Sequence, residues 1–170
     1  MKTQVWAHRG ASAYAPENTL EAFRLAAEMG ADGVELDVQL SRDGKLVVAH
    51  DETIDRVSNG TGYIKDYTLA QLKKLSFNRL FPDFKDARIP TLKEVYELLK
   101  PAGLTVNVEL KTGIILYPEI EEKVLALTAS MGMEDRVIYS SFCHPSLVRL
   151  KELDSGLKTG LLYSDGWIDA

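Results

Sequence analysis

Hydrophobic and polar residues alternate without a break from Val34 to Leu40. Because successive side chains of a β-strand point to opposite faces, this pattern predicts a strand with one apolar and one polar face. The polar face carries Glu35, Asp37 and Gln39. This strand therefore presents two carboxylates on the same side.

A second alternating stretch covers residues 105–111. Three aliphatic residues lie on one face, and Asn107, Glu109 and Lys111 lie on the other. The polar face of this second strand again carries a carboxylate.

Asp43-Gly44 separates the first of these strands from another alternating run, residues 45–50. Asp-Gly between two alternating runs is a strong hairpin signal, and the connection is too short for a crossover between parallel strands. A two-residue loop would place Asp37 directly opposite His50, with Cβ atoms about 5 Å apart.

Strand-like and helix-like segments alternate along most of the chain. Asn18 is expected to cap the first helix, with Glu21 three residues later, and Thr91 and Glu94 form a capping box at another. The pattern predicts strands near residues 5–8, 33–40, 105–111, 137–142 and 157–163, and helices near residues 18–30, 91–100, 118–131 and 145–153. This alternation indicates a parallel α/β sheet or barrel.

Residues 51–90 break the alternation. Turn-forming residues such as Asn59-Gly60 and Phe81-Pro82 flank a short helix expected at 68–75. We interpret residues 51–90 as a loop-rich insertion. Residues 1–170 are expected to form one domain, because a chain of this length can form a single core that buries roughly 70% of the surface of the unfolded chain.

Composition narrows the function classes. The chain is 45% hydrophobic and 26% charged, which excludes a disordered or collagen-like protein. A net charge of -5 and the lack of a basic run argue against nucleic acid as a partner. The single Cys143 and the absence of a signal-peptide pattern indicate a reducing, cytoplasmic compartment. No apolar stretch approaches the ~20 residues that cross a bilayer, so stable membrane insertion is not expected.

The candidate chemistry follows from the polar faces. In a barrel the face opposite the helices points inward, so Glu35, Asp37 and Glu109 should converge. Three unpaired carboxylates repel one another and raise each other's pKa, and a hard divalent cation with oxygen ligands, Mg²⁺ or Ca²⁺, resolves this. Zinc is not expected, because the set consists of carboxylates and contains no cysteine.

Two histidines and two basic residues accompany the carboxylates. His8 ends the first strand and His50 ends the hairpin arm, and the imidazole group is suited to general acid and general base catalysis. Arg9 and Lys111 add positive charge. A cation, two histidines, an arginine and a lysine suit an anionic phosphorus substrate.

Each group also has a purely structural interpretation. The two carboxylates of residues 34–40 can form a solvated strand face, Glu109 and Lys111 an ion pair, and His50 part of a turn. The third histidine, His144, precedes a proline at a helix start and is interpreted as a capping or surface residue. The joint placement of the groups at strand ends favours a site.

The ordered motifs resemble those of the glycerophosphodiester phosphodiesterase family. They are His8-Arg9-Gly10, Pro16-Glu17-Asn18-Thr19, Gly33-Val34-Glu35-Leu36-Asp37-Val38, Asp43-Gly44, His50-Asp51 and Val108-Glu109-Leu110-Lys111. The resemblance extends from Val5 to at least Tyr163. It implies a TIM-type barrel related to phosphatidylinositol-specific phospholipases C, and an enzyme that hydrolyses glycerophosphodiesters to glycerol 3-phosphate and an alcohol.

The resemblance also implies a role for each motif residue. Glu35, Asp37 and Glu109 would hold the metal, His8 and His50 would form the acid/base pair, and Arg9 and Lys111 would bind the phosphate of a small-molecule substrate. Glu17 and Asn18 belong to the motif and are given only a minor role near the substrate.

The family pattern has eight barrel strands, of which we count five here. An open five-stranded sheet exposes apolar edges, so self-association or completion by further C-terminal polypeptide is expected. Trp167 and Ile168 are expected to lack a partner. The alternative functions are a lipid phosphodiesterase of the lysophospholipase D or sphingomyelinase D type, and a truncated module without catalysis.

Overall fold

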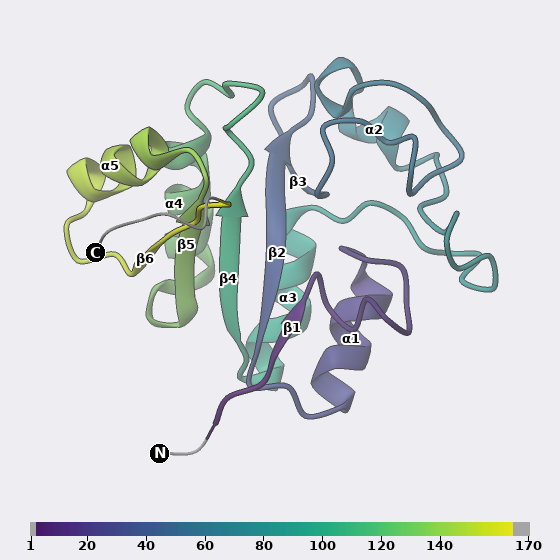
Figure 1. Cartoon of the computed structure of the whole chain (residues 1–170), viewed down its shortest axis with the longest axis horizontal. Helices are drawn as coiled ribbons and strands as arrows, with labels where there is room; N and C mark the ends of the chain where they lie inside the picture. The colour runs from purple at the N-terminus through teal and green to yellow at the C-terminus, as the bar shows by residue number, and fades with distance from the viewer. Residues whose placement is uncertain (1–2, 165–170) are drawn as a thin grey trace.

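Five parallel strands and one antiparallel strand form a single sheet in the computed structural model, which describes residues 3–164 (Figure 1). The strands are β1 (Trp6–His8), β2 (Gly33–Leu40), β3 (Leu46–Val48), β4 (Thr105–Leu110), β5 (Val137–Ser141) and β6 (Thr159–Leu161). Their order is β1-β2-β4-β5-β6, and β3 pairs with β2 in antiparallel orientation. The expected path of five parallel strands with a hairpin arm beside it is confirmed.

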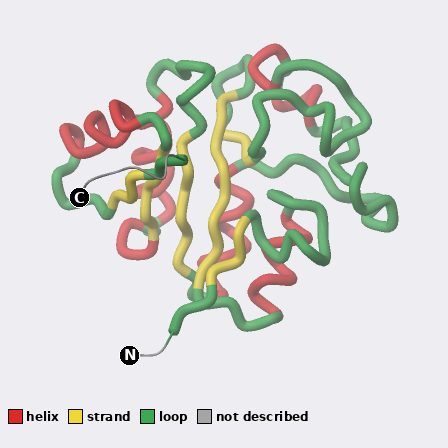
Figure 2. Tube along the Cα trace, in the orientation of Figure 1, coloured by secondary structure: helices red, strands yellow, loops and turns green. Residues whose placement is uncertain are grey.

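The helices alternate with the strands along the chain, as the colouring by secondary structure shows (Figure 2). They are α1 (Leu20–Glu28), α2 (Leu69–Leu72), α3 (Leu92–Ala102), α4 (Ile120–Met131) and α5 (His144–Leu153), with short 3₁₀ turns η1 (Ile64–Asp66) and η2 (Glu134–Arg136). In Figure 1, α3 and α4 lie behind the sheet and cover one of its faces.

The covered face contains the apolar half of each alternating strand. Leu36 of β2 pairs with Val108 of β4, and both are fully buried against α3 residues such as Val95 and Leu99. The opposite face presents the polar half, which starts with Glu35 and Asp37 on β2. The alternation in the sequence therefore determines which side of the sheet is available for chemistry.

Two helix starts were expected from capping residues. At α3 the box is confirmed: the Thr91 hydroxyl accepts the Glu94 N–H, and the Glu94 carboxylate accepts the Thr91 N–H at 2.7 Å. At α1 the expectation is wrong by one residue, because Thr19 caps the helix through the Ala22 N–H. Asn18 instead has a left-handed backbone, with φ of 56°.

The hairpin register also differs from the expectation by one residue. Its loop has three residues and closes with Gly44 in the left-handed conformation (φ 70°), whose N–H donates to the Ser41 carbonyl oxygen at 2.8 Å. Such a loop adds one residue to the turn. Asp37 therefore faces Ala49, and the expected pairing of Asp37 with His50 is wrong.

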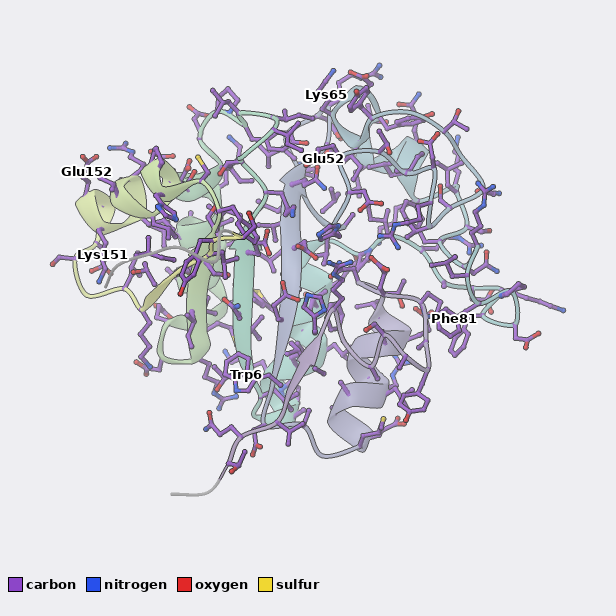
Figure 3. The ribbon with its side chains drawn as sticks, in the orientation of Figure 1. Trp6, Glu52, Lys65, Phe81, Lys151 and Glu152 are labelled. Atoms are coloured by element: carbon purple, nitrogen blue, oxygen red, sulfur yellow. The ribbon has the colours of Figure 1, made fainter. Side chains whose placement is uncertain are left out.

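Residues 51–90 lie at the carboxyl end of β2 and extend away from the sheet (Figure 1). Figure 3 labels Glu52 and Lys65 at this end of the molecule, Phe81 at the tip of the segment and Trp6 at the opposite end of the sheet. The helix expected at 68–75 is shorter, covering only α2. A small second core of buried residues supports the segment: Val47, Ala49, Ile54, Ile64, Leu72, Phe77 and Ile89.

The strands β1 and β6 form the two edges of the described sheet. Leu161 on β6 and Val5, next to β1, are each 63% exposed. Trp167 and Ile168, for which we expected no partner, lie outside the described residues.

Candidate active site

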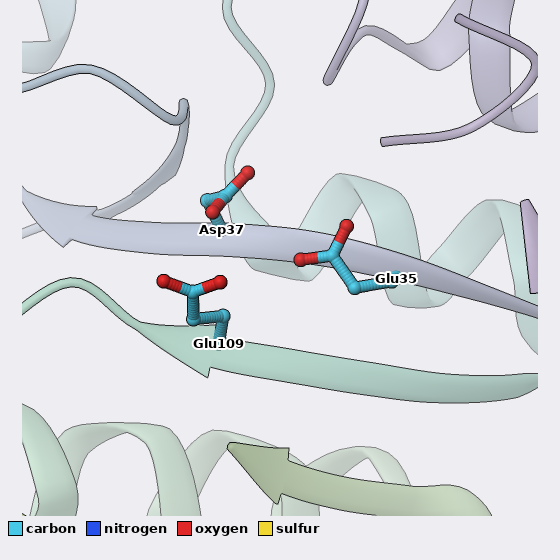
Figure 4. A group of neighbouring side chains, drawn as sticks. All are labelled: Glu35, Asp37 and Glu109. Atoms are coloured by element: carbon cyan, nitrogen blue, oxygen red, sulfur yellow. The ribbon is translucent and has the colours of Figure 1, made fainter. Parts of the chain in front are cut away.

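Three carboxylates converge on the polar face of the sheet. Glu35, Asp37 and Glu109 each offer an oxygen within 4.8 Å of the others. Register explains the arrangement, because Asp37 on β2 and Glu109 on β4 are directly paired, and Glu35 lies two residues before Asp37 on the same face. Figure 4 shows the three side chains on one side of the two strands, as the sequence predicts.

Burial makes this cluster electrostatically unfavourable by itself. The Asp37 side chain is fully buried, and one oxygen each of Glu35 and Asp37 has no hydrogen-bond partner among the described residues. Burial, with the negative charges of Asp37 and Glu109, raises the pKa of Glu35 to about 8, despite the Arg9 N–H that stabilises its charged form.

The donor set fits a hard divalent cation. All three ligand side chains are carboxylates, and the two unpartnered buried oxygens supply the lone pairs that such a cation requires. The charge of a bound cation would also relieve the repulsion between the three groups. These residues could therefore hold a metal ion.

Arg9 lies at the carboxyl end of β1, next to the carboxylates. Its N–H donates to Glu35 Oε2 at 3.1 Å, and its guanidinium Nε lies 3.7 Å from Asp37 Oδ2. The guanidinium also donates to Glu17 Oε1 at 3.1 Å. The backbone is left-handed at Arg9 (φ 58°), a conformation that is strained for a residue with a side chain and that recurs at functional sites.

Lys111 follows β4 directly and provides the second positive charge. Its Nζ lies 3.0 Å from Glu109 Oε1 and 3.9 Å from Asp37 Oδ1. Arg9 and Lys111 thus flank the carboxylates, which is the arrangement that the sequence predicts.

The two histidines have different environments. His8 Nε2 lies 3.7 Å from Glu35 Oε2, and its side chain is 69% exposed, so it adjoins the cluster and remains open to solvent. His50 instead contacts its sequence neighbour, with Nδ1 2.6 Å from Asp51 Oδ1. Because of the shifted hairpin register, no contact between the His50 ring and the three carboxylates is found among the described residues.

Two residues contribute more to the site than the sequence analysis indicated, in which Asn18 has only a minor role near the substrate and Gln39 is assigned no role. Asn18 is buried, and its amide donates to Asp37 Oδ2 at 2.8 Å, so it orients a central carboxylate. Gln39 is also buried, and its amide donates to the carbonyl oxygens of Ala49 and Asp51 at 2.9 and 2.7 Å. Gln39 could have been found from its place on the polar face of the strand, whereas Asn18 gave the signal of a helix cap.

Fold and site together define an α/β protein of the barrel type with a candidate divalent-metal site at the carboxyl ends of its parallel strands, where such barrels place their active sites. A sequence model of the glycerophosphoryl diester phosphodiesterase family matches residues 8–167. The chain belongs to this family.

Known proteins agree with the assignment. The chain is 53% identical over 170 residues to a glycerophosphodiester phosphodiesterase of Caldanaerobacter subterraneus subsp. tengcongensis, covering 99% of this chain and 70% of the relative. It matches the crystal structure of a glycerophosphodiester phosphodiesterase from Agrobacterium tumefaciens with a TM-score of 0.85 and 37% identity, covering 93% of this chain and 66% of that one. It also matches an Oleispira antarctica phosphodiesterase in complex with the product sn-glycerol-3-phosphate, with a TM-score of 0.81 and 35% identity, covering 94% and 65%.

The chain thus spans about two thirds of the length of these relatives. The structural neighbours are TIM-type barrels, and the described sheet is an incomplete barrel of that type. Within residues 3–164, no helix is both long and apolar enough to cross a membrane.

Proposed function

We propose that this chain carries the catalytic site of a metal-dependent phosphodiesterase, which hydrolyses glycerophosphodiesters to glycerol 3-phosphate and an alcohol. The observation that carries the proposal is the cluster of Glu35, Asp37 and Glu109 within 4.8 Å, flanked by Arg9 and Lys111. The product bound by the Oleispira antarctica relative supports the substrate class.

The carboxylates would hold Mg²⁺ or Ca²⁺, both of which prefer oxygen ligands. When bound, the cation would supply Lewis-acid stabilisation of negative charge on the phosphate.

The free thiol of Cys143 supports a reducing, cytoplasmic compartment for the protein.

Arg9 and Lys111 would orient the phosphodiester. Each now contacts carboxylates of the cluster, so a cation at those carboxylates would free their N–H groups for phosphate oxygens. The planar guanidinium suits two phosphate oxygens at once, whereas the ammonium acts as a point charge.

His8 and His50 would move the protons. One imidazole accepts the proton of the attacking hydroxyl as the hydroxyl oxygen forms a bond to phosphorus. The other imidazole protonates the oxygen of the leaving alcohol as the bond between that oxygen and phosphorus breaks. The attacking hydroxyl belongs either to water or to the glycerol of the substrate, and in the second case water then opens the cyclic product.

Rates of glycerophosphocholine hydrolysis test this proposal. We expect activity with Mg²⁺ or Ca²⁺ and its loss in EDTA, with one limb of the pH–rate profile missing in His8→Ala and the other in His50→Ala. His144→Ala is the matched control, because within residues 3–164 that ring bonds to the Leu162 carbonyl oxygen, outside the cluster. Full activity in EDTA, or unchanged rates in both active-site variants, would contradict the assignment.

A second candidate function has one observation in its favour. Ile114 and Leu116, in the loop that follows β4 and Lys111, are 77% and 80% exposed. Apolar side chains at this end of the sheet suit a substrate with an acyl chain, as in a lysophospholipase D-type reaction. Faster hydrolysis of lysophosphatidylcholine than of glycerophosphocholine would favour this candidate, and the reverse ranking would favour the first.

A further inference from the structure

Arg56 in the 51–90 segment bridges two carboxylates from different parts of the chain. Its Nη1 and Nη2 donate to the two oxygens of Glu17, both at 2.7 Å. Its Nε and Nη2 donate to the two oxygens of Asp51, at 2.7 and 3.2 Å. The guanidinium thus engages both carboxylates in a forked geometry that a lysine cannot reproduce.

Each of these carboxylates contacts a candidate catalytic or phosphate-binding side chain. Asp51 Oδ1 lies 2.6 Å from His50 Nδ1, and Glu17 Oε1 accepts a hydrogen bond from Arg9 at 3.1 Å. A continuous path of charged hydrogen bonds therefore joins His50 to Arg9 through Asp51, Arg56 and Glu17.

The charged groups around the hollow beside His50 belong to this path. Among the described residues, the charged groups that line the hollow beside His50 are Glu17, Asp51 and Arg56. Gln39 holds the backbone of the His50 segment in place through carbonyl oxygens. The backbone is thus fixed by one residue and the ring by another.

On the basis of the proposed function, we infer that Arg56 is a positioning residue. Through Asp51 it sets the orientation and proton position of the His50 imidazole, and through Glu17 it aligns Arg9. With Asp51 ionised by its contact with Arg56, the neutral imidazole donates from Nδ1. Nε2 is then left without a proton and can accept one. Among the described residues, the hydrogen bonds of the Arg56 side chain go to Glu17 and Asp51 and to none of the three candidate metal ligands.

The signs of two substitutions distinguish positioning from a merely structural role. In Arg56→Gln, the Asp51 charge acts on the ring without the neighbouring cation, so the imidazolium is stabilised and the midpoint of the His50 titration rises by roughly half a pH unit or more. In Asp51→Asn the negative charge itself is lost, so the midpoint falls. Loss of a structural contact would not produce opposite shifts.

The first measurement is made on the metal-free protein. Two-bond ¹H–¹⁵N spectra of the histidine rings report both titration and the protonated nitrogen, and His50→Ala assigns the signals. We expect a proton on Nδ1 in the unmodified protein and the two opposite shifts in the variants. Arg56→Ala, which also removes the cation, serves as the second variant where Arg56→Gln does not fold.

The second measurement is turnover of glycerophosphocholine. We expect kcat/KM to fall about 10- to 100-fold in Arg56→Lys, with a lower kcat from His50 and a higher KM from Arg9. Guanidinium ions at millimolar concentration should partly restore Arg56→Ala. Arg149→Lys is the matched control, because Arg149 donates from Nε and Nη2 to one carboxylate oxygen of Glu122 on the helical surface, outside the described site.

The inference is overturned when the His50 titration and tautomer stay unchanged in both Arg56 variants, or when activity falls only in proportion to the loss of folded protein. Absence of turnover in the unmodified chain bears instead on the proposed function. The imidazole spectra decide the role of Arg56 in that case too, because they require no substrate and no metal.

Discussion

Asp37 shows how a single side chain is prepared for its role. One of its oxygens accepts the Asn18 amide, and the other lies within 3.9 Å of Lys111 without a hydrogen bond. The fold thus fixes the carboxylate from one side and leaves lone pairs free on the other. The left-handed backbone at Asn18 brings its side-chain amide to Asp37. Glycine also adopts this backbone conformation readily.

Removing the Asn18 amide should weaken metal binding more than folding. Asn18→Gly keeps the left-handed backbone, so we expect about a 10- to 100-fold loss of Mg²⁺ or Ca²⁺ affinity with roughly 1–2 kcal/mol lower stability. Asn18→Ala adds backbone strain and should be less stable than Asn18→Gly. Calorimetric titration and denaturant unfolding measure the two effects, and unchanged affinity in Asn18→Gly would show that the amide has no part in the site.

The raised pKa of Glu35 leads us to predict that the stability of the metal-free protein depends on pH. Its pKa is about 8 in the folded state against 4.5 as the reference, so the folded protein binds more protons than the unfolded chain between these values. Stability from this group is therefore complete below pH 4.5 and is lost as the pH rises through about 8. Melting curves should show this decline, and Glu35→Gln or saturating Mg²⁺ should reduce it. An equal decline in Glu35→Gln would assign it to other groups.

At this scale the sequence predicted the three carboxylates and the two basic residues, because a period of two residues places side chains on a known face. It assigned Asn18 only a minor role near the substrate and did not predict its hydrogen bond to Asp37, because an asparagine just before a helix is also a common helix cap. It also did not predict the link between His50 and Arg56, because contacts made by loops have no periodicity.

Among the elements, the β1–α1 connection determines where His8 and Arg9 lie. Gly10 has a φ of 79°, and a Cβ atom at this position would lie 2.7 Å from the backbone of Ala22 in α1. The loop can therefore approach the helix only because residue 10 has no side chain.

Gly10→Ala should accordingly be far more damaging than the same change at Gly30. Both glycines are left-handed, but a Cβ at Gly30 meets nothing within 4 Å, so Gly30→Ala isolates the cost of the backbone conformation, about 1 kcal/mol. We expect Gly10→Ala to cost at least about 2 kcal/mol more and to lower turnover. Chemical denaturation of both variants checks this, and equal losses would show that the close approach does not matter.

The hairpin shows what element-level patterns leave open. Asp43-Gly44 correctly indicated an antiparallel turn, but the same dipeptide fits loops of two or three residues. The left-handed Gly44 closes the longer loop, and this moves His50 one position along. A one-residue change in loop length turns each following side chain to the opposite face of the sheet. The geometry of the site therefore depends more on the length of the loop than on the strand pattern.

At the scale of the whole molecule, the alternation of strands and helices predicted the order of the strands. The number of strands determines which of them form the edges of the described sheet. β1 and β6 each pair with one strand of the described sheet, and apolar residues near both edges are exposed. An uncovered parallel edge with apolar flanks promotes association.

We therefore expect concentration-dependent self-association of the 170-residue chain. Leu161→Lys and Val5→Lys place charges on the two edges and should shift the sedimentation profile towards the monomer. Val148→Lys, on the exposed surface of α5, is the matched control. A monomer at all concentrations would show that these edges do not pair between copies.

The central claim is that the carboxylate cluster supports release of glycerol 3-phosphate from a diester. ³¹P spectra of glycerophosphocholine incubated with the chain and Mg²⁺ or Ca²⁺ test it most directly. We predict conversion of the diester signal to that of glycerol 3-phosphate, and no conversion in EDTA or with Asp37→Asn that retains the unmodified protein's circular dichroism spectrum. Conversion undiminished in folded Asp37→Asn, or no conversion by the unmodified chain with either metal, would contradict the account.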